Sequence, residues 1–477
     1  MQRWVTQKRV KGNSRDTINA YQFPTRNGRE THQMEIKMTD IFTPAKRGAA
    51  TVIALGSAMA VLIAFTPALA VESGKPLQSD TAAGDDGIRP FQIHVDQSQI
   101  DDLKTRIRNS RWPDKETVGD ISQGIQLARV QDLVQYWGSD YDWRKAEKEL
   151  NALPQFITRI DGVDIHFIHV RSRHPNALPV ILTHGWPGSI FEFTKVIGPL
   201  TDPTAYGGKA EDAFDVIIPS IPGYGFSGHP TDLGWGPERV AHAWDTLVKR
   251  LGYTRYVSQG GDHGSVISDA LARQAPKGLL GIHLNMPATV PGALMKGINS
   301  GDPAPADLST PERNAYNALQ EFFGRNAAYG AMMVTRPQTI GYSLSDSPSG
   351  LASFIYEKFV QWSDSNGEPE NVLSRDEMLS DITLYWLTNS GASGARFYWE
   401  NNNNNFSADA QKTRDIKIPV GITVFPKEIY QAPESWSRQA YPSLTYYHQV
   451  DHGGHFAAWE QPEIFSREIR EAFRKLR

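Results

Sequence analysis

The sequence has no cysteine among its 477 residues, which excludes disulfide bonds, thiolate metal ligands and a cysteine nucleophile. It also lacks a surplus of positive charge. Its 49 Lys and Arg are outnumbered by 53 Asp and Glu, so its overall charge does not indicate a nucleic-acid partner. Apolar material is plentiful: 40% of the residues are hydrophobic, and 12 are Trp. That composition supports a sizeable core, excludes a largely disordered chain, and at this length allows one large domain or two to three ordinary ones.

A long uncharged stretch stands near the beginning of the chain. Residues 48–71 carry no charge, follow a segment rich in Lys and Arg, and end in Ala68-Leu69-Ala70, a pattern that signal peptidases cut. We interpret residues 38–70 as a signal peptide or, because the apolar run is long, as an uncleaved membrane anchor. The protein is therefore expected to be exported (periplasmic or secreted), or anchored to a membrane through residues 48–71.

The segments on either side of this stretch are assigned no packed structure. Residues 1–37 look like a leader or an over-long start. Residues 71–87 are small and polar and contain Pro and Gly, as is typical of a linker. The folded part of the chain is expected to begin at Ile88.

The first part of the folded chain predicts a strand, two helices and a hairpin. Ile93 and Val95 alternate as in a strand, and apolar residues then follow at helical spacing over residues 100–107. A second amphipathic helix is predicted over residues 127–137. Two alternating runs joined by an Asp-Gly turn predict a β-hairpin over residues 156–170.

Beyond the hairpin, short apolar runs alternate with helical patterns. The predicted strands are Pro179–Thr183, Phe214–Pro219, Tyr256–Gln259, Leu279–Leu284, Pro419–Phe425 and Leu444–Val450. This order predicts a mostly parallel α/β sheet preceded by the hairpin. Helix-like sequence rich in Tyr, Phe, Met and Asn fills the gap between Leu284 and Pro419, and an insertion of that length is expected to be a helical lid. The Asn401–Asn405 run is interpreted as a flexible loop.

The strand at Tyr256 leads into Gly260-Gly261-Asp262-His263-Gly264 and then into a helix. Small residues two positions on either side of a central nucleophile are typical of the strand–turn–helix elbow of α/β-hydrolases. Here the central residue is Asp, whose carboxylate needs no base to attack and is suited to forming an alkyl ester at saturated carbon. The alternative is that Asp262 only caps the helix.

A second motif follows the strand ending at Thr183. His184-Gly185-Trp186-Pro187-Gly188 occupies the position where α/β-hydrolases place half of their oxyanion hole. The backbone N–H groups of Trp186 and His263 are expected to converge on a carboxylate oxygen of Asp262 and to stabilise the oxyanion that forms during ester hydrolysis. An ordinary Pro-Gly turn with a packed Trp is the alternative.

The third motif lies after the last predicted strand. His455 is expected to take a proton from the water that attacks the ester, whereas His452 suits a surface loop. Glu428, in FPKEI, is the predicted acid that orients His455, and Asp451 is the rival acid. The order Asp, Glu, His matches the nucleophile–acid–His order of α/β-hydrolases.

From Ile88 to the C-terminus the chain resembles the epoxide hydrolases of the microsomal type. The resemblance is carried by HGWPGS, PGYGFSG, GGDHGS, SDSPSGLASFIYEKF, RFYWEN, FPKEI and GGHFAAWEQPE. It implies an α/β-hydrolase fold with a wrapping N-terminal meander over residues 88–155, core segments at 156–288 and 416–477, and the helical lid at 289–415, after the sixth strand.

The resemblance also implies the roles of the site residues: Asp262 as nucleophile, His455 as base, Glu428 as its acid, and Tyr398 and Tyr329 as lid tyrosines that hydrogen-bond the epoxide oxygen. A phenol can donate a proton to the departing alkoxide. The alternative is that both tyrosines only pack the lid. Relatives usually carry Trp where this chain has His263, which adds a titratable group beside the site.

The expected reaction is hydrolysis of an epoxide to a vicinal diol. Water and a small lipophilic epoxide are the expected partners, with no cofactor and no metal. Haloalkane dehalogenase chemistry and a non-catalytic small-molecule binder remain alternatives, while the elbow's lack of Ser or Cys disfavours an esterase. Detoxification, catabolism and biosynthesis are all compatible with the sequence, which leaves the oligomeric state open.

Overall fold

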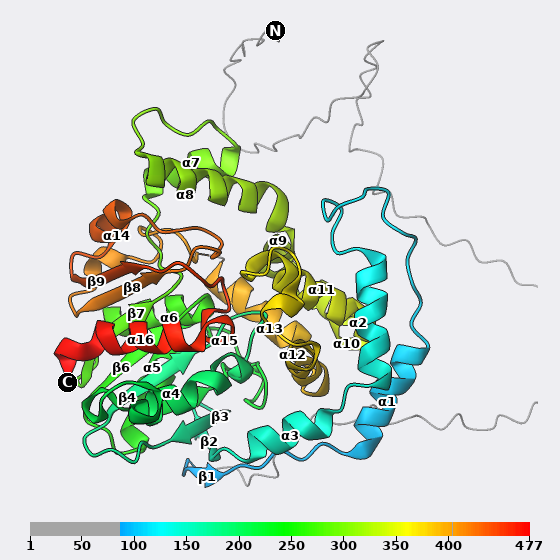
Figure 1. The fold of residues 1–477 in the computed structure, drawn as a ribbon, viewed down its shortest axis with the longest axis horizontal. Helices are drawn as coiled ribbons and strands as arrows, with labels where there is room; N and C mark the ends of the chain where they lie inside the picture. Colours follow the sequence, from blue (N-terminus) through cyan, green and yellow to red (C-terminus); the bar gives the residue numbers. More distant parts are fainter. Residues whose placement is uncertain (1–85, 403) are drawn as a thin grey trace, which may run out of the picture. The chain divides into compact units, whose positions relative to one another are not determined.

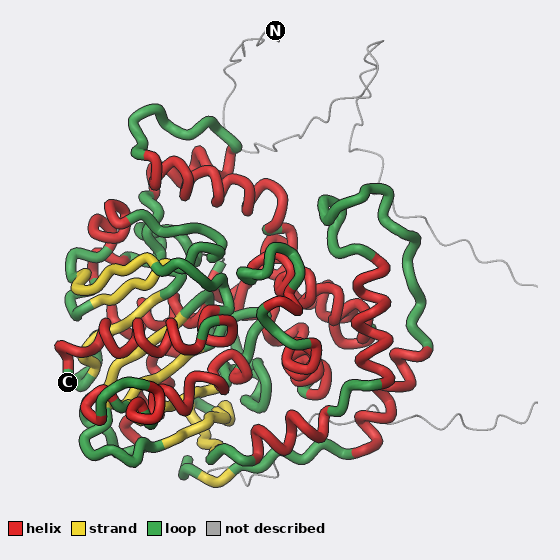
Figure 2. Tube along the Cα trace, viewed as in Figure 1, coloured by secondary structure: helices red, strands yellow, loops and turns green. Residues whose placement is uncertain are grey.

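The computed structural model describes residues 86–402 and 404–477 and contains a nine-stranded sheet (Figures 1 and 2). Its strands are β1 (Arg89–Pro90), β2 (Gln155–Ile160), β3 (Val163–Val170), β4 (Leu178–Thr183), β5 (Phe214–Pro219), β6 (Tyr256–Gly260), β7 (Leu279–Leu284), β8 (Val420–Val424) and β9 (Leu444–Gln449). They lie in the order β1-β2-β3-β5-β4-β6-β7-β8-β9. The pairs β1–β2, β2–β3 and β3–β5 are antiparallel. The pairs that follow in this order, from β5–β4 to β8–β9, are parallel. The predicted mostly parallel sheet preceded by a hairpin is confirmed.

Burial explains why the parallel strands read as continuous apolar runs in the sequence. Every residue of β4 and of β8 is buried, since helices cover both faces of the sheet. The helices of the core are α4 (Ile197–Thr201), α5 (Pro237–Arg250), α6 (His263–Gln274), α14 (Glu434–Ala440), α15 (Ala457–Glu460) and α16 (Pro462–Phe473). Helices α4 and α16 pack together on one face of the sheet, and α5 and α6 pack together on the other (Figure 1).

The N-terminal part of the described chain contains α1 (Gln97–Arg108), α2 (Leu127–Ser139) and α3 (Trp143–Asn151), the last of which the sequence analysis missed. The prediction of a strand at Ile93 and Val95 is wrong. Their backbone N–H groups donate instead to side chains of α3, at 2.8 Å to Asn151 Oδ1 and 2.8 Å to Glu147 Oε1. The side chains of Ile93 and Val95 are buried, but the extended backbone between them pairs with no strand. The alternation of apolar and polar residues in the sequence therefore reflects burial and not sheet pairing.

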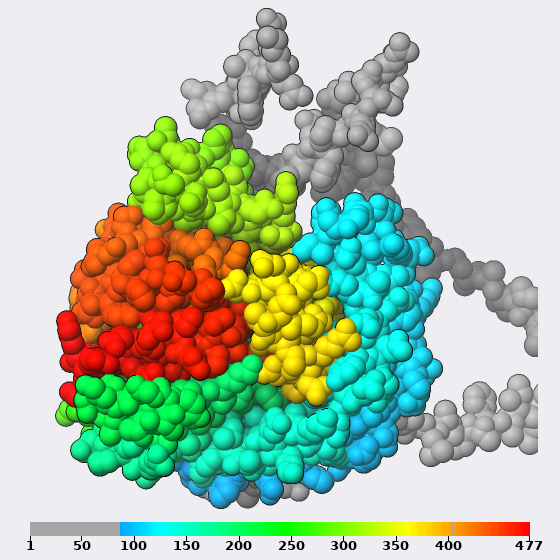
Figure 3. Space-filling model, viewed as in Figure 1, coloured from blue at the N-terminus to red at the C-terminus, as the bar shows by residue number. Residues whose placement is uncertain are grey.

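Between β7 and β8 lies the helical insertion, with helices α7 (Gly292–Ser300), α8 (Thr310–Glu321), α9 (Ala328–Thr335), α10 (Pro337–Asp346), α11 (Pro348–Trp362), α12 (Arg375–Leu387) and α13 (Ser390–Asn401). The N-terminal helices pack against it: Trp137 Nε1 donates to Thr383 Oγ1 at 2.8 Å, and Tyr141 bonds Ser380 at 3.1 Å. In Figure 3 the later helices of the insertion, in yellow, lie between the cyan N-terminal segment and the orange and red end of the chain, whereas α7 and α8, in yellow-green, lie at the top of the view. The N-terminal segment thus contacts both the first sheet edge, through β1, and the insertion.

The interpretation of the asparagine run as a flexible loop is wrong at its two ends. Asn401 is the last residue of α13, and both Asn401 and Asn405 are buried. Their side chains bond each other, with Asn401 Nδ2 donating to Asn405 Oδ1 at 2.6 Å.

The predicted signal peptide or anchor at residues 38–70 lies outside the described residues. Within those residues, no helix combines the length and the apolar character that a membrane crossing needs.

Candidate active site

Asp262 stands on a sharp turn between β6 and α6. Its backbone has φ 49° and ψ −123°, a left-handed conformation that is uncommon for a residue with a side chain. The two flanking glycines explain how the turn is possible. A Cβ at Gly260 would lie 2.0 Å from the carbonyl oxygen of Gly264, and one at Gly264 would lie 2.0 Å from that of Thr183. Only glycine fits at both positions, which accounts for the small-x-Asp-x-small pattern in the sequence.

The turn after β4 brings Trp186 to this carboxylate. The Trp186 N–H donates to Asp262 Oδ1 at 3.0 Å, as expected for one half of an oxyanion hole. His263 is the first residue of α6, so its N–H has no partner within the helix, and it makes no hydrogen bond to Asp262 in the described part of the chain. Of the two predicted backbone donors, the Trp186 N–H therefore bonds the Asp262 carboxylate in this structure, and the His263 N–H belongs to the residue next to Asp262.

His455 lies between Glu428 and Asp262. Its Nδ1 is 2.7 Å from Glu428 Oε1, and its Nε2 is 3.8 Å from Asp262 Oδ2. All three side chains are at least 94% buried, and they come from loops after β6, β8 and β9. Asp451, the rival acid, is exposed and forms no ion pair with His455. The geometry therefore pairs the base with Glu428.

The charges around His455 set its protonation state. Burial alone lowers the pKa of His455, but the negative charge and hydrogen bond of Glu428, followed by the charges of Asp262 and Glu192, outweigh it and raise the pKa to about 9. At neutral pH the imidazole of the resting protein therefore carries a proton. Esterification of Asp262 would remove one of the negative charges that hold this proton.

Tyr398 and Tyr329 lie above the carboxylate in an aromatic cluster with Trp186. The Tyr329 ring stacks on Trp186 at 4.9 Å, and the Tyr398 ring meets both of them edge-on at 5.9 Å. The hydroxyl of Tyr398 is buried and forms no hydrogen bond within the described residues. An unpartnered buried hydroxyl is costly, so a ligand oxygen here would satisfy it.

Burial raises the pKa of both tyrosines well above the ordinary phenol value. For Tyr398 the neighbouring Tyr329 and then Asp262 add to the effect of burial, and for Tyr329 the next contribution is the charge of Asp262. Both phenols therefore keep their protons throughout the physiological range. They can donate to an oxygen that develops negative charge but are not themselves bases.

The ring of His263 is enclosed by aromatic side chains. It lies 4.5 Å from the rings of both Phe397 and Tyr398, and its Nδ1 is 3.5 Å from Asp262 Oδ1. Burial lowers the pKa of His263, against the charge of Asp262. Neither ring nitrogen has a hydrogen-bond partner among the residues described. The imidazole of His263, which the sequence analysis predicted to lie beside the site, is therefore neutral at pH 7.

The sequence analysis missed three residues that contact the site. The Trp362 carbonyl accepts the His455 N–H at 2.9 Å, and the Trp362 ring packs on the imidazole at 5.0 Å. Lys358 is buried, pairs with Glu357, and places its Nζ 4.6 Å from the centre of the Tyr329 ring. Glu192 follows the HGWPGS motif and lines a cavity with Asp262 and His455. For Glu192, the only signal in the sequence was a carboxylate three residues after that motif.

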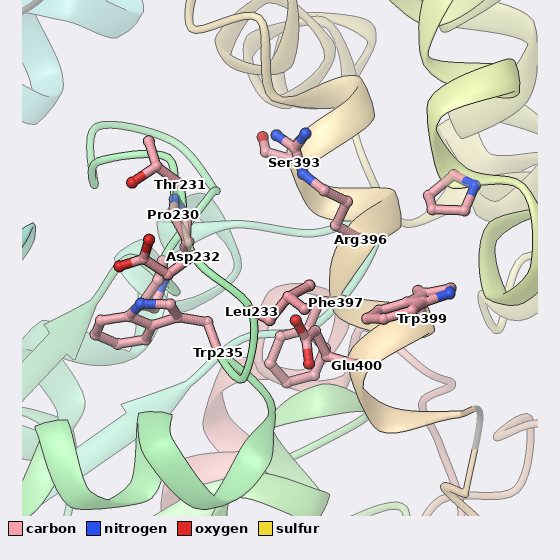
Figure 4. A pocket seen from close by; sticks show the side chains of 12 residues that line it. Pro230, Thr231, Asp232, Leu233, Trp235, Ser393, Arg396, Phe397, Trp399 and Glu400 are labelled. Atoms are coloured by element: carbon pink, nitrogen blue, oxygen red, sulfur yellow. The ribbon is translucent and has the colours of Figure 1, made fainter.

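A mostly apolar hollow lies beside α13 (Figure 4). It measures about 290 Å³ and is formed by α13 and the loop before α5, with Leu233, Trp235 and Trp399 among its apolar walls. None of the predicted catalytic side chains lines it. Phe397 separates the two sites, since it lines the hollow and also packs on His263.

No cluster of His, Asp and Glu that could hold a metal ion is found in residues 86–402 and 404–477.

Two family models match the chain. A family model described as "Epoxide hydrolase N terminus" matches residues 88–193, and one described as "alpha/beta hydrolase fold" matches residues 179–462. The chain is 53% identical over 391 residues to a Stigmatella aurantiaca protein provisionally named an epoxide hydrolase, covering 82% of this chain and 86% of that protein. It is 36% identical over 410 residues to epoxide hydrolase 1 of Sus scrofa, covering 83% and 90%.

Among solved structures, the chain resembles the juvenile hormone epoxide hydrolase of the silkworm Bombyx mori. The TM-score is 0.73 at 32% sequence identity, and the match covers 82% of this chain and 96% of that one. The structure of Aspergillus niger epoxide hydrolase matches with a TM-score of 0.69 at 31% identity, over 82% and 96% of the two chains.

Proposed function

The chain belongs to the epoxide hydrolases that join an N-terminal epoxide-hydrolase segment to an α/β-hydrolase fold, and we propose that it acts through a covalent ester on Asp262. Its substrates are an epoxide and water. The observation that best supports the covalent route is the position of His455, 2.7 Å from Glu428 and 3.8 Å from Asp262. An imidazole held in this way can activate a water at the carbonyl of an ester on Asp262.

In the first step, a carboxylate oxygen of Asp262 attacks one carbon of the epoxide. The oxygen available is Oδ2, since Oδ1 accepts the Trp186 N–H. As the C–O bond of the epoxide breaks, Tyr398 and Tyr329 hydrogen-bond its oxygen and supply the proton that the alkoxide needs. The unpartnered Tyr398 hydroxyl supports this role. The product is a β-hydroxyalkyl ester of Asp262.

In the second step, water attacks the ester carbonyl carbon of Asp262. Loss of the Asp262 charge lowers the pKa of His455, which gives up its resting proton to restore the tyrosine that protonated the alkoxide. The neutral imidazole can then take a proton from the water while Glu428 stabilises the imidazolium that forms. The tetrahedral oxyanion is stabilised by the N–H groups of Trp186 and His263. Its collapse breaks the bond to the alkyl oxygen, which takes a proton from His455 and leaves as the diol. The Asp262 carboxyl group formed in this step then gives its proton to His455, which restores the resting state.

The inserted helices act as a lid over this site. They supply Tyr329 and Tyr398, and with Phe354 and Trp362 they enclose Trp186 in aromatic rings. A site walled in this way favours a lipophilic epoxide over a polar one, because an apolar substrate gives up little hydration on entering it. We also propose that residues 38–70 direct the protein out of the cytoplasm or anchor it in a membrane.

A single turnover in ¹⁸O-labelled water tests the covalent route. With enzyme in excess over styrene oxide, the account predicts a diol without the label and an ¹⁸O atom in the Asp262 carboxylate, which peptide mass spectrometry would locate. Labelled diol and unlabelled Asp262 would mean that water attacks the epoxide directly. A chlorinated alkane serves as the control substrate, and its turnover in place of the epoxide would favour a dehalogenase.

A further inference from the structure

A buried lysine of α11 lies beside the site and has no part in the mechanism described above. Lys358 belongs to the SDSPSGLASFIYEKF run of the sequence, and its side chain is only 2% exposed. Lysine is almost never fully buried unless its charge is paired, because an ammonium group is costly to remove from water. The surroundings of this ammonium group therefore indicate what it does.

One carboxylate keeps the amine of Lys358 in its charged form. Lys358 Nζ donates a hydrogen bond to Glu357 Oε1, and it lies 3.4 Å from Gln361 Oε1. Burial lowers the pKa of Lys358, but the charge and the hydrogen bond of Glu357 oppose this. The Glu357 side chain is 24% exposed, so solvent screens its negative charge more than it screens the buried ammonium. The positive charge of the pair therefore acts on the interior more strongly than the negative charge.

On its inner side, the ammonium group lies over two aromatic rings. Lys358 Nζ is 4.6 Å from the centre of the Tyr329 ring and 5.5 Å from the centre of the Trp362 ring. A cation at this distance is attracted to the face of the ring, and the attraction is stronger where water is excluded. The other contact of Tyr329 is its stacking on Trp186, whose N–H bonds the Asp262 carboxylate. A fixed positive charge is therefore in contact with one of the two phenols above the nucleophile.

A cation in contact with a phenol makes its hydroxyl a stronger donor. As an epoxide opens, negative charge develops on its oxygen and passes in part to the phenol that donates to it. A nearby positive charge stabilises this charge, and the effect is large where side chains are as buried as Tyr329 and Asp262. Lys358 reaches the reaction only through Tyr329, so it is a positioning residue and not a catalytic one.

We propose that Lys358 holds Tyr329 above Asp262 and strengthens its hydroxyl as the proton donor to the epoxide oxygen. The inference rests on the proposed function. As the epoxide C–O bond breaks, its electron pair stays on the oxygen, which takes the proton of Tyr329. The Tyr329 phenolate then lies beside the ammonium group until the proton from His455 returns. No lysine or arginine of the described residues lies over the Tyr398 ring, so Tyr398 contributes a hydrogen bond and Tyr329 the proton.

This role depends on one hydroxyl group and affects one chemical step. Tyr329→Phe keeps the ring and its attraction for the cation but removes the hydroxyl, so in that background Lys358 should no longer affect alkylation of Asp262. A purely structural role would slow alkylation in both backgrounds. It would also slow hydrolysis of the ester, because the Trp362 ring under Lys358 packs on the His455 imidazole at 5.0 Å.

The test measures the two steps separately, by rapid quench and mass spectrometry of the Asp262 peptide with styrene oxide. Lys358→Met removes the charge and keeps an apolar stem; it is expected to slow alkylation about 10-fold and to leave hydrolysis within about 3-fold of the wild-type rate. Lys358→Arg keeps the charge and should alkylate within about 3-fold of the wild-type rate. In the Tyr329→Phe background, Lys358→Met should slow alkylation by less than about 2-fold.

Arg129→Met is the matched control. The Arg129 guanidinium lies over the ring of Tyr356, another tyrosine of the inserted helices, at 5.7 Å, and pairs with Glu368 outside the site. This variant is expected to change neither step. If Lys358→Met does not fold, Lys358→Gln removes the charge, keeps a donor for Glu357, and should give the same two rates.

Three results would overturn the role of Lys358 while ester formation still supported the nucleophile. They are a wild-type rate of alkylation without the charge, equal slowing of alkylation with and without the Tyr329 hydroxyl, and equal slowing of alkylation and hydrolysis. Absence of ester in the wild type and in His455→Gln would overturn the proposed function and this inference together.

Discussion

At the scale of single residues, two sets of side chains meet at Asp262 from opposite sides. The inserted helices bring two phenols that keep their protons, and the core brings an imidazole with its acid. The first set suits the departure of an alkoxide and the second suits the activation of water. The two chemical steps should therefore respond to different substitutions.

Tyr398→Phe is expected to slow alkylation of Asp262 by about 100-fold, the usual effect of removing one donor from a developing oxyanion. Tyr329 still supplies a donor, so the double variant should lose more. Hydrolysis of ester already formed should change little in either. Rapid-quench measurement of the two rates checks this, with Tyr342→Phe, an exposed tyrosine of the insertion, as the control.

The two steps should also differ in their dependence on pH. The pKa of His455 is raised to about 9 in the resting enzyme, and alkylation of Asp262 removes one of the charges responsible. Neutral imidazole is the active form for hydrolysis, so this rate should fall as pH decreases, with a midpoint below the resting value of about 9. Comparing the pH profile of hydrolysis with an NMR titration of resting His455 checks this. Coincident midpoints would contradict the account.

The positions of Asp262, Glu428 and His455 close to one another could be predicted because each follows a strand in an order that the fold fixes. Glu192 could not be predicted, since its position depends on how the turn after Ser189 folds back over Gly188. The neutral state of the His263 ring was also hidden in the sequence. It results from enclosure by Phe397 and Tyr398, which are more than 130 residues away along the chain.

At the scale of elements, side chains and not sheet pairing hold the extended segment at Ile93 and Val95 to α3. Asn151 of α3 both donates to the carbonyl oxygen and accepts from the N–H of Ile93, each at 2.8 Å. The sequence could not show this, because buried extended segments and strands share the same alternation. The helices at residues 100–107 and 127–137 were predictable from their apolar spacing, and both form.

Asn151→Ala removes both of these hydrogen bonds and leaves backbone groups of Ile93 without partners. The free energy of unfolding should decrease by about 1–3 kcal/mol. The turnover number should stay within about 2-fold, because Asn151 contacts no group of the site. Chemical denaturation and steady-state kinetics check this, and Asn109→Ala, an exposed residue whose side chain makes no hydrogen bond, should cost under about 0.5 kcal/mol. An unchanged stability in Asn151→Ala would contradict the account.

At the scale of the whole molecule, the site is closed. Asp262, His455 and Tyr398 are each less than 10% exposed, so we expect the inserted helices to move relative to the core when an epoxide enters. The sheet and the place of the insertion were predictable from the alternation of strands and helices. The packing of the inserted helices against one another could not be predicted. A helix such as α12 is buried on more than one face, so the spacing of its apolar residues does not show which helix it contacts.

The N-terminal prediction is also tested on the whole chain. After expression in a bacterium, the protein is expected either to begin at Val71, with residues before it removed, or to remain uncut in the membrane fraction. Fractionation and intact mass distinguish the two outcomes, and a chain beginning at Asp86 should stay in the cytoplasm with its activity intact. Uncut protein in the soluble cytoplasmic fraction would contradict both.

The most direct test of the central claim is the intact mass of His455→Gln after mixing with styrene oxide. Without the base, the second step should stall while the first proceeds. The account predicts a mass increase equal to one epoxide, located on the peptide that contains Asp262 and absent from an Asp262→Asn, His455→Gln double variant. An unmodified His455→Gln protein, with wild-type enzyme forming diol from the same epoxide, would contradict the covalent ester.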